Sequence, residues 1–255
     1  MKNLFSVEGK IALVTGGSRG IGLMIARGFV ENGACVYVAS RKAEECEKVA
    51  KDLSKFGDCH GIAADLSTQD GAKKLADEVG KRTSKLDVLV NNAGANWGAP
   101  MAEYPDAAWH KVMDLNINAL FFLTREVGRR AMIPRQSGRI INIASIAGLG
   151  GNPGGIHTIA YNTSKGAVVN FTRALATEWG PQGINVNAIC PGFFPSKMSQ
   201  GLLDVIEPQV IAATPLRRLG GDEDLQGAVV YLASAASRHV TGQCLAVDGG
   251  MSVVI

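Results

Sequence analysis

A tyrosine and a lysine four residues apart, Tyr161 and Lys165, are the first candidates for chemistry in this chain of 255 residues. Residues at i and i+4 share one face of a helix, so the ammonium group would lie near the phenol. A nearby positive charge favours the phenolate and is expected to lower a pKa that is about 10 in water. The spacing therefore predicts a tyrosine with a lowered pKa, although the pair alone does not establish catalysis.

Two further polar residues belong to the same candidate site. Ser145 follows a strand expected over 139–144, at the carboxyl edge where open α/β sheets bind their ligands. Asn116 lies in the helix expected before that strand, and taken alone it is better explained as a buried amide that bonds its neighbours. Asn116, Ser145, Tyr161 and Lys165 are the candidates for a catalytic set.

A glycine-rich turn follows the first expected strand and opens a helix, with the pattern T-G-x-x-x-G-x-G from Thr15 to Gly22. It is not a Walker A loop, because no Gly-Lys-Ser/Thr follows. Glycines in this position permit a tight turn and a close approach of the backbone to a pyrophosphate at the positive end of the helix. The turn predicts dinucleotide binding by Gly16, Ser18, Arg19, Gly20, Ile21 and Gly22.

The end of the second expected strand indicates which dinucleotide is bound. An acidic residue there would bind the 2′-hydroxyl of NAD, but Ser40 and Arg41 occupy that place. Arg41 and Arg19 could pair with a 2′-phosphate through charge-assisted hydrogen bonds, which favours NADP(H). The alternative is that Arg41 only begins a solvated helix.

Short β-branched runs alternate with helical patterns along the whole chain. This alternation predicts an α/β fold with one doubly wound, mostly parallel sheet of seven strands and helices on both faces, in a single domain over residues 1–255. Strands are expected over 10–15, 34–39, 59–64, 86–90, 139–144, 184–189 and 243–247. Helices are expected over 20–32, 42–55, 68–81, 106–132, 160–179 and 222–234.

The composition excludes several classes of protein. A chain with 46% hydrophobic residues and a formal net charge of +3 buries enough surface to fold, which excludes disorder. No long basic run is present, so we expect no nucleic-acid partner. The five cysteines are far apart and form no CxxC pair, so we expect reduced thiols and no metal site.

The uncharged stretch 140–164 raises the question of a membrane span. Its glycines, Pro153 and polar residues are typical of a strand followed by a loop, so we expect no membrane span. The first ten residues hold too short an apolar run for a signal peptide, and a cytoplasmic location is expected.

Together these motifs resemble the short-chain dehydrogenase/reductase family, in the order of that family and over nearly the whole chain. The resemblance extends to 3-oxoacyl reductases of the rhamnolipid and fatty-acid type. It rests on the glycine turn, Asp65-Leu66, Asn91-Asn92-Ala93-Gly94, Asn116, Ser145, Tyr161-x-x-x-Lys165, Pro191-Gly192 and Val247-Asp248-Gly249-Gly250.

The resemblance implies a role for each of these residues in reducing a ketone with NADP(H). Tyr161 would be the general acid, Ser145 would hold the carbonyl oxygen, Lys165 would bind the nicotinamide ribose and lower the pKa of Tyr161, and Asn116 would hold a water. Further cofactor contacts are implied for Asp65, Leu66, Asn92, Ala93, Gly94, Pro191, Gly192, Phe194 and Ser196.

Substrate contacts are expected from the loops at the carboxyl edge, where Ser145 and Tyr161 are separated by a lengthened glycine-rich loop. Apolar residues there suit an acyl chain better than a sugar. The expected substrate residues are Ser145, Trp97, Ile156, His157, Phe193 and Met198. The alternatives are a polyol or gluconate dehydrogenase, which shares all these motifs, and a non-catalytic NADP(H)-binding sensor or scaffold.

Two kinds of protein partner are considered. Five arginines, at 125, 129, 130, 135 and 139, could receive an acidic acyl carrier protein, or could simply form a solvated helix face. The resemblance also implies a homotetramer or homodimer that packs through the helices expected over 106–132 and 160–179.

Overall fold

Seven parallel strands form the centre of the protein, as seen in a computed structural model that describes residues 3–152 and 155–254. Their order across the sheet is β3-β2-β1-β4-β5-β6-β7. The order reverses direction between β1 and β4, which is the point where open α/β sheets bind ligands. The strands are β1 (Ile11–Thr15), β2 (Cys35–Ser40), β3 (Cys59–Ala63), β4 (Val88–Asn91), β5 (Gly138–Ile143), β6 (Ile184–Pro191) and β7 (Cys244–Val247).

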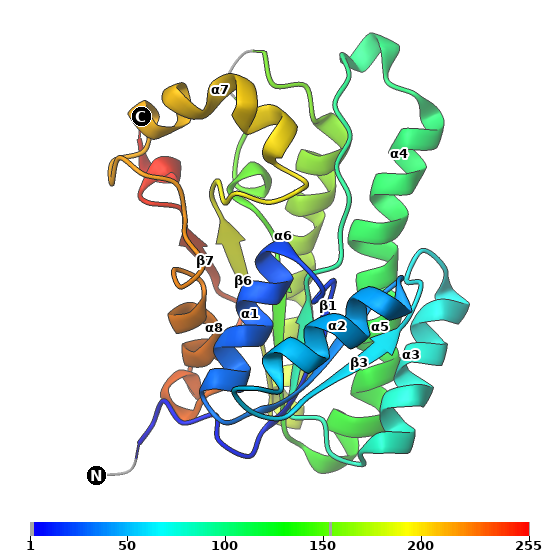
Figure 1. Cartoon of the computed structure of the whole chain (residues 1–255). Helices are drawn as coiled ribbons and strands as arrows, with labels where there is room; N and C mark the ends of the chain where they lie inside the picture. Colours follow the sequence, from blue (N-terminus) through cyan, green and yellow to red (C-terminus); the bar gives the residue numbers. More distant parts are fainter. Residues whose placement is uncertain (1–2, 153–154, 255) are drawn as a thin grey trace.

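Helices cover both faces of this sheet (Figure 1). One core cluster joins α1, α2 and α8 to one face, and another joins α3, α5 and α6 to the opposite face. The helices are α1 (Gly20–Glu31), α2 (Ala43–Leu53), α3 (Gln69–Arg82), α4 (Asp106–Met113), α5 (Ala119–Val127), α6 (Ile159–Trp179), α7 (Gln200–Ala213) and α8 (Gln226–Ala233).

The prediction of a doubly wound, single-domain α/β fold is confirmed, and most predicted element ends lie within two residues of the observed ones. The helix predicted over 106–132 is present without a break, but two of its turns, Asp114–Asn118 and Gly128–Met132, are wider π-helical turns that the sequence did not indicate. The last helix begins at Gln226 rather than at 222.

Helix α7 is absent from the sequence-based prediction. It carries Pro208 in its interior, and a proline in a helix removes a hydrogen bond and argues against helix. Only Leu203 and Val210 of α7 are buried, so its helical pattern is weak. Figure 1 shows α7 above the carboxyl ends of the strands, away from the sheet.

Within the described part of the chain, no helix is both long and apolar enough to cross a membrane. The uncharged stretch that raised the question is β5, then a short 3₁₀ turn at Ile146–Gly148, and then the start of α6. Pro153 and Gly154 of the intervening loop lie outside the described residues.

Candidate active site

A cavity of about 660 Å³ opens over the carboxyl ends of the central strands. Of the residues predicted to contact the cofactor, all but Phe194 lie in its wall, and so do the catalytic candidates Ser145, Tyr161 and Lys165. Asn116 does not line it. The sheet has therefore brought together residues that are up to 180 positions apart, from Gly16 to Ser196.

The glycine turn is built so that a side chain would not fit. Gly16 and Gly20 have φ of +63° and +51°, a conformation that favours glycine. A Cβ at Gly22 would lie 2.2 Å from the carbonyl oxygen of Gly16 and 2.5 Å from Nδ2 of Asn92. The bare backbone and the start of α1 leave room for an anion at a positive helix end, so the residues fit a dinucleotide.

Neighbouring strand ends hold this turn in place. The Asn92 side-chain amide donates to the carbonyl oxygen of Thr15 at 2.9 Å. The Thr15 hydroxyl accepts from the backbone N–H groups of Asn92 and Ala93, each at 3.0 Å. The turn after β1 and the loop after β4 therefore form one rigid wall of the cavity.

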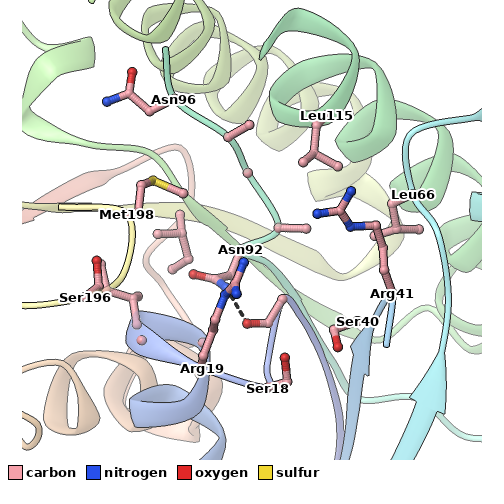
Figure 2. Close-up of a pocket in the computed structure, with 18 of the residues that line it drawn as sticks. Ser18, Arg19, Ser40, Arg41, Leu66, Asn92, Asn96, Leu115, Ser196 and Met198 are labelled. Atoms are coloured by element: carbon pink, nitrogen blue, oxygen red, sulfur yellow. Dashed lines mark hydrogen bonds between the residues drawn. The ribbon is translucent and has the colours of Figure 1, made fainter. Parts of the chain in front are cut away.

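The end of the cavity beside β1 and β2 carries basic side chains. Arg19 comes from the glycine turn and Arg41 from the end of β2, and Figure 2 shows both side chains extending into the same space beside Ser40. Asp65 does not cancel this charge by a direct ion pair. Its carboxylate accepts the Ser67 backbone N–H at 3.0 Å, and hydrogen bonds from Ser67 are the main reason that the pKa of Asp65 is lowered.

Ser145, Tyr161 and Lys165 meet where β5 ends and α6 begins. Ser145 is buried, and its hydroxyl accepts the Ala147 backbone N–H at 3.1 Å. The Lys165 ammonium donates to the carbonyl oxygen of Ile143 at 2.6 Å and lies 5.5 Å from the centre of the Tyr161 ring. The predicted i, i+4 geometry on one helix is therefore present.

The sequence predicts a lowered pKa for Tyr161, and the shift in the structure has the opposite direction. Burial raises the pKa of Tyr161 above its ordinary value, although a hydrogen bond from Ser145 favours the phenolate. Burial also lowers the pKa of Lys165 to about 8. The physical reason is desolvation, which disfavours the charged form of each group.

Asn116 lies in the first π-helical turn, where the backbone N–H of Ala119 donates five residues back to Asp114. The Asn116 side chain accepts from the Ala95 backbone N–H at 2.7 Å and donates to the carbonyl oxygen of Ala95 and the Ser164 hydroxyl, each at 2.9 Å. Both amide protons are used, so the side chain joins the loop after β4 to α6.

The predicted substrate residues are dispersed. Only Ser145 and Met198 line the cavity. Trp97 is 43% exposed and lies under the Lys111 ammonium, and the exposed His157 accepts the Ala99 backbone N–H on its carbonyl at 2.9 Å. Ile156 is half-buried in the same loop as His157.

Phe193 and Phe194 line a second, separate cavity of about 420 Å³ between the residues after β6 and the end of β7. The Phe194 ring packs against Gly220, where a Cβ would lie 2.3 Å from it. Its side chain is therefore used in packing, and neither phenylalanine is seen in the wall of the main cavity.

Several residues that line the cavity were not predicted from the sequence. They are charged or polar side chains without a motif, and only the fold brings them to the cavity: Lys42, Glu45, Asn96, Lys111, Asp114 and Lys197. The structure also brings Cys35, Asp58 and His60 together near the amino ends of β2 and β3, where their potential ligand atoms lie within 4.8 Å of one another. The sequence did not indicate this grouping.

Comparison with known proteins agrees with this geometry. Residues 10–205 match the short chain dehydrogenase family. The rhamnolipids biosynthesis 3-oxoacyl-[acyl-carrier-protein] reductase of Pseudomonas aeruginosa is 42% identical over 257 residues, which cover 98% of this chain and 99% of the relative.

Two other matches bear on the site. The gluconate 5-dehydrogenase of Gluconobacter oxydans is 38% identical and covers 98% of each chain. The solved Pseudomonas aeruginosa RhlG/NADP active-site complex superposes with a TM-score of 0.93 at 41% identity, covering 99% of this chain and 100% of that one.

Proposed function

Since this chain belongs to the short chain dehydrogenase family and is an NADP-dependent oxidoreductase, we propose that it reduces the ketone of a 3-oxoacyl thioester to the 3-hydroxyacyl form. The observation that supports the choice of substrate is a set of exposed apolar side chains on the loops that follow β4, β5 and β6, of which Met198 lines the cavity. Trp97, Met101, Leu149 and Met198 are 43%, 71%, 44% and 51% exposed. An acyl chain would cover these side chains, which a small polar substrate would leave in water.

NADPH, when bound, would supply a hydride for the carbonyl carbon. Tyr161 would give its proton to the carbonyl oxygen, and its raised pKa keeps that proton in place at neutral pH. The Ser145 hydroxyl would donate a hydrogen bond to the same oxygen and so stabilise the developing negative charge.

Lys165 and Asn116 would support this proton transfer. Lys165 would hold the nicotinamide ribose while its ammonium stays beside the Tyr161 ring. The side chain of Asn116 is fully used, so the predicted role of holding a water would fall to its backbone carbonyl in the π-helical turn. Such a water would return a proton to Tyr161 from solvent.

Arg19, Ser40 and Arg41 would hold the 2′-phosphate of the cofactor. Guanidinium groups bind phosphate through paired, charge-assisted hydrogen bonds, and an Asp at position 41 would instead repel it. The backbone of the glycine turn would hold the pyrophosphate, with Asp65 and Leu66 beside the adenine.

The experiment is a comparison of kcat/KM with NADPH for acetoacetyl-CoA and for 5-ketogluconate. We expect turnover of the thioester, and activity on the sugar acid alone would overturn the choice of substrate. The Tyr161→Phe variant serves as the control, because both activities must be lost in it if they use the same site. A sensor or scaffold without catalysis would show no turnover of any ketone.

A sugar-acid oxidoreductase is the second candidate. Lys111 and Lys197 line the cavity, and either ammonium could neutralise a substrate carboxylate. The gluconate dehydrogenase relatives make this the first alternative to test.

An acyl carrier protein is a weaker candidate for a partner than the run of arginines suggested. Arg129 and Arg130 pair with Glu126, and Arg135 pairs with Asp87. Arg139 is half-buried, and Arg125 lies over the rings of Phe121 and Phe122. Most of these arginines already contact groups within the chain. We therefore favour a thioester of coenzyme A over a thioester of acyl carrier protein as the substrate.

Self-association is the partner interaction we propose. Phe121 on α5 is 43% exposed and contacts the ring of Phe171 on α6 at a centroid distance of 6.5 Å, which leaves an aromatic patch on these helices. A second copy of the chain would cover it in a homodimer or homotetramer. The cytoplasmic location stays a prediction.

A further inference from the structure

The basic end of the cavity contains one acidic side chain that the proposed function does not use. Arg19, Arg41, Lys42 and Lys197 all line the cavity, and Glu45 lines it among them. Four cations would suit a phosphate, whereas a carboxylate beside them would oppose it.

Glu45 is held in this position by its place on α2. It lies in the first turn of the helix, directly after the strand end that carries Ser40 and Arg41. Its carboxylate accepts a hydrogen bond from the Lys42 ammonium at 3.0 Å, and its side chain is 39% exposed.

The cations around Glu45 come from three separate segments. Lys42 begins α2, Arg19 belongs to the glycine turn, and Lys197 follows β6. Lys42 is the main reason that the pKa of Glu45 is lowered, and the charges of Arg19 and Lys197 add to it. The carboxylate is therefore ionised at neutral pH and shares Arg19 with the proposed 2′-phosphate.

We propose that Glu45 is an internal counter-ion of the 2′-phosphate site and limits how tightly NADP(H) is held. This inference rests on the proposed placement of the 2′-phosphate at Arg19 and Arg41. In the free protein the carboxylate neutralises part of the basic cluster. When the phosphate enters, it shares these cations with Glu45 and is repelled by it.

The size of the effect follows from charge and distance. Two like charges several ångströms apart at a solvated surface change a binding constant by about fivefold, and added salt reduces the change. NADH has a neutral hydroxyl in place of the phosphate, so its binding is expected to change little. Glu45 therefore lowers the preference for NADPH over NADH without touching the reacting atoms.

The test is the Kd of NADPH and of NADH, measured by fluorescence titration at low and high salt for Glu45→Gln. The matched control is Glu44→Gln, which removes the same charge one residue away, where the side chain is exposed and does not line the cavity. We expect Glu45→Gln to bind NADPH about fivefold more tightly at low salt, with a smaller gain at high salt. NADH binding should stay constant, and Glu44→Gln should resemble the wild type.

Four results would overturn the proposal: no gain in Glu45→Gln, a loss of NADPH affinity, an equal gain for NADH, or the same gain in Glu44→Gln. A third variant, Arg41→Gln, shows whether the counter-ion role of Glu45 is wrong or the placement of the 2′-phosphate at Arg19 and Arg41 is wrong. If Arg41→Gln keeps the wild-type ratio of the two Kd values, the placement is wrong and the counter-ion role falls with it. If Arg41→Gln loses NADPH selectively and Glu45→Gln shows no gain, only the counter-ion role is wrong.

Discussion

The two halves of the cavity are built differently. The cofactor half consists of strand ends and the turns directly after them, joined by bonds such as that from Asn92 to Thr15. The substrate half consists of longer connections, namely the loop after β4 and the segment that leads into α7, together with Ser145 after β5. The strand ends therefore hold the cofactor, which serves many different reactions, and the loops form the half that selects the substrate.

Burial shows the same contrast. Thr15, Asn91, Ser145 and Lys165 are buried, and their polar groups are positioned by the sheet and α6. Trp97, Met101, Leu149 and Met198 are exposed, so no core packing determines their identity. Changes in the cofactor half should therefore affect binding or turnover of every substrate, whereas changes in the substrate half should affect one substrate more than another.

The largest expected effect is that of Tyr161→Phe, which removes the proposed acid but keeps the ring. We expect kcat to fall by about a thousandfold for every ketone, because general acid catalysis contributes on that scale. The Kd of NADPH should remain within about twofold, since the lost hydroxyl faces the substrate. Undiminished turnover in steady-state assays would contradict the mechanism.

A second large effect is expected from Gly22→Ala in the cofactor half. The new Cβ would lie 2.2 Å from the Gly16 carbonyl oxygen, so the turn must shift, and overpacking of this kind costs about 1–3 kcal/mol. We expect NADPH binding, measured by titration, to weaken by about tenfold or more.

The matched control for this variant is Gly80→Ala on α3, where a Cβ would meet nothing within 4 Å. Alanine is favoured over glycine in a helix, so this variant should be as stable as the wild type or more stable, with unchanged cofactor binding. Equal losses of binding in the two variants would refute the close-approach explanation.

A smaller and selective effect is expected from Met198→Ser in the substrate half. The change removes apolar surface from the cavity wall, and each buried CH₂ is worth about 0.8 kcal/mol. The KM for a long-chain 3-oxoacyl-CoA should rise several-fold, while the KM for acetoacetyl-CoA should change little. A uniform rise for both chain lengths would place Met198 outside the acyl-binding part of the cavity.

The smallest effect concerns pH. Burial lowers the pKa of Lys165 to about 8, so its positive charge is present below that pH and is lost as the pH rises through it. The proton of Tyr161 persists to higher pH because the pKa of that residue is raised. We therefore expect kcat/KM for NADPH to fall by a few-fold above about pH 8, and Lys165→Met to show no such fall. A wild-type profile that stays flat through this range would contradict the role of Lys165.

The difference between the halves also explains what the sequence could predict. The glycine turn and the Tyr161–Lys165 pair have fixed spacings imposed by one turn or one helix, so their places in the cavity follow from local geometry. Glu45 and Lys197 reach the cavity only through the packing of α2 and of the segment after β6, which no local pattern records. The reversed pKa shift of Tyr161 likewise depends on burial, which is a property of the whole fold.

The substrate half was predicted least well for a related reason. Ser145 and Met198 lie in the cavity wall, but Phe193 and Phe194 belong to a second cavity and to packing against Gly220. Apolar residues after a strand can serve either purpose, and their type does not say which. Helix α7 was also not predicted from the sequence. A proline such as Pro208 argues against a helix locally, and only the tertiary environment shows that a helix forms there.

Internal competition between two ketones tests the proposed reaction most directly. The protein is incubated with NADPH and equal concentrations of a 3-oxoacyl-CoA and 5-ketogluconate, and the reduced products are identified by mass spectrometry. The ratio of products then equals the ratio of the two kcat/KM values. We predict that the 3-hydroxyacyl thioester dominates, and a mixture that contains mainly reduced sugar acid would contradict the account.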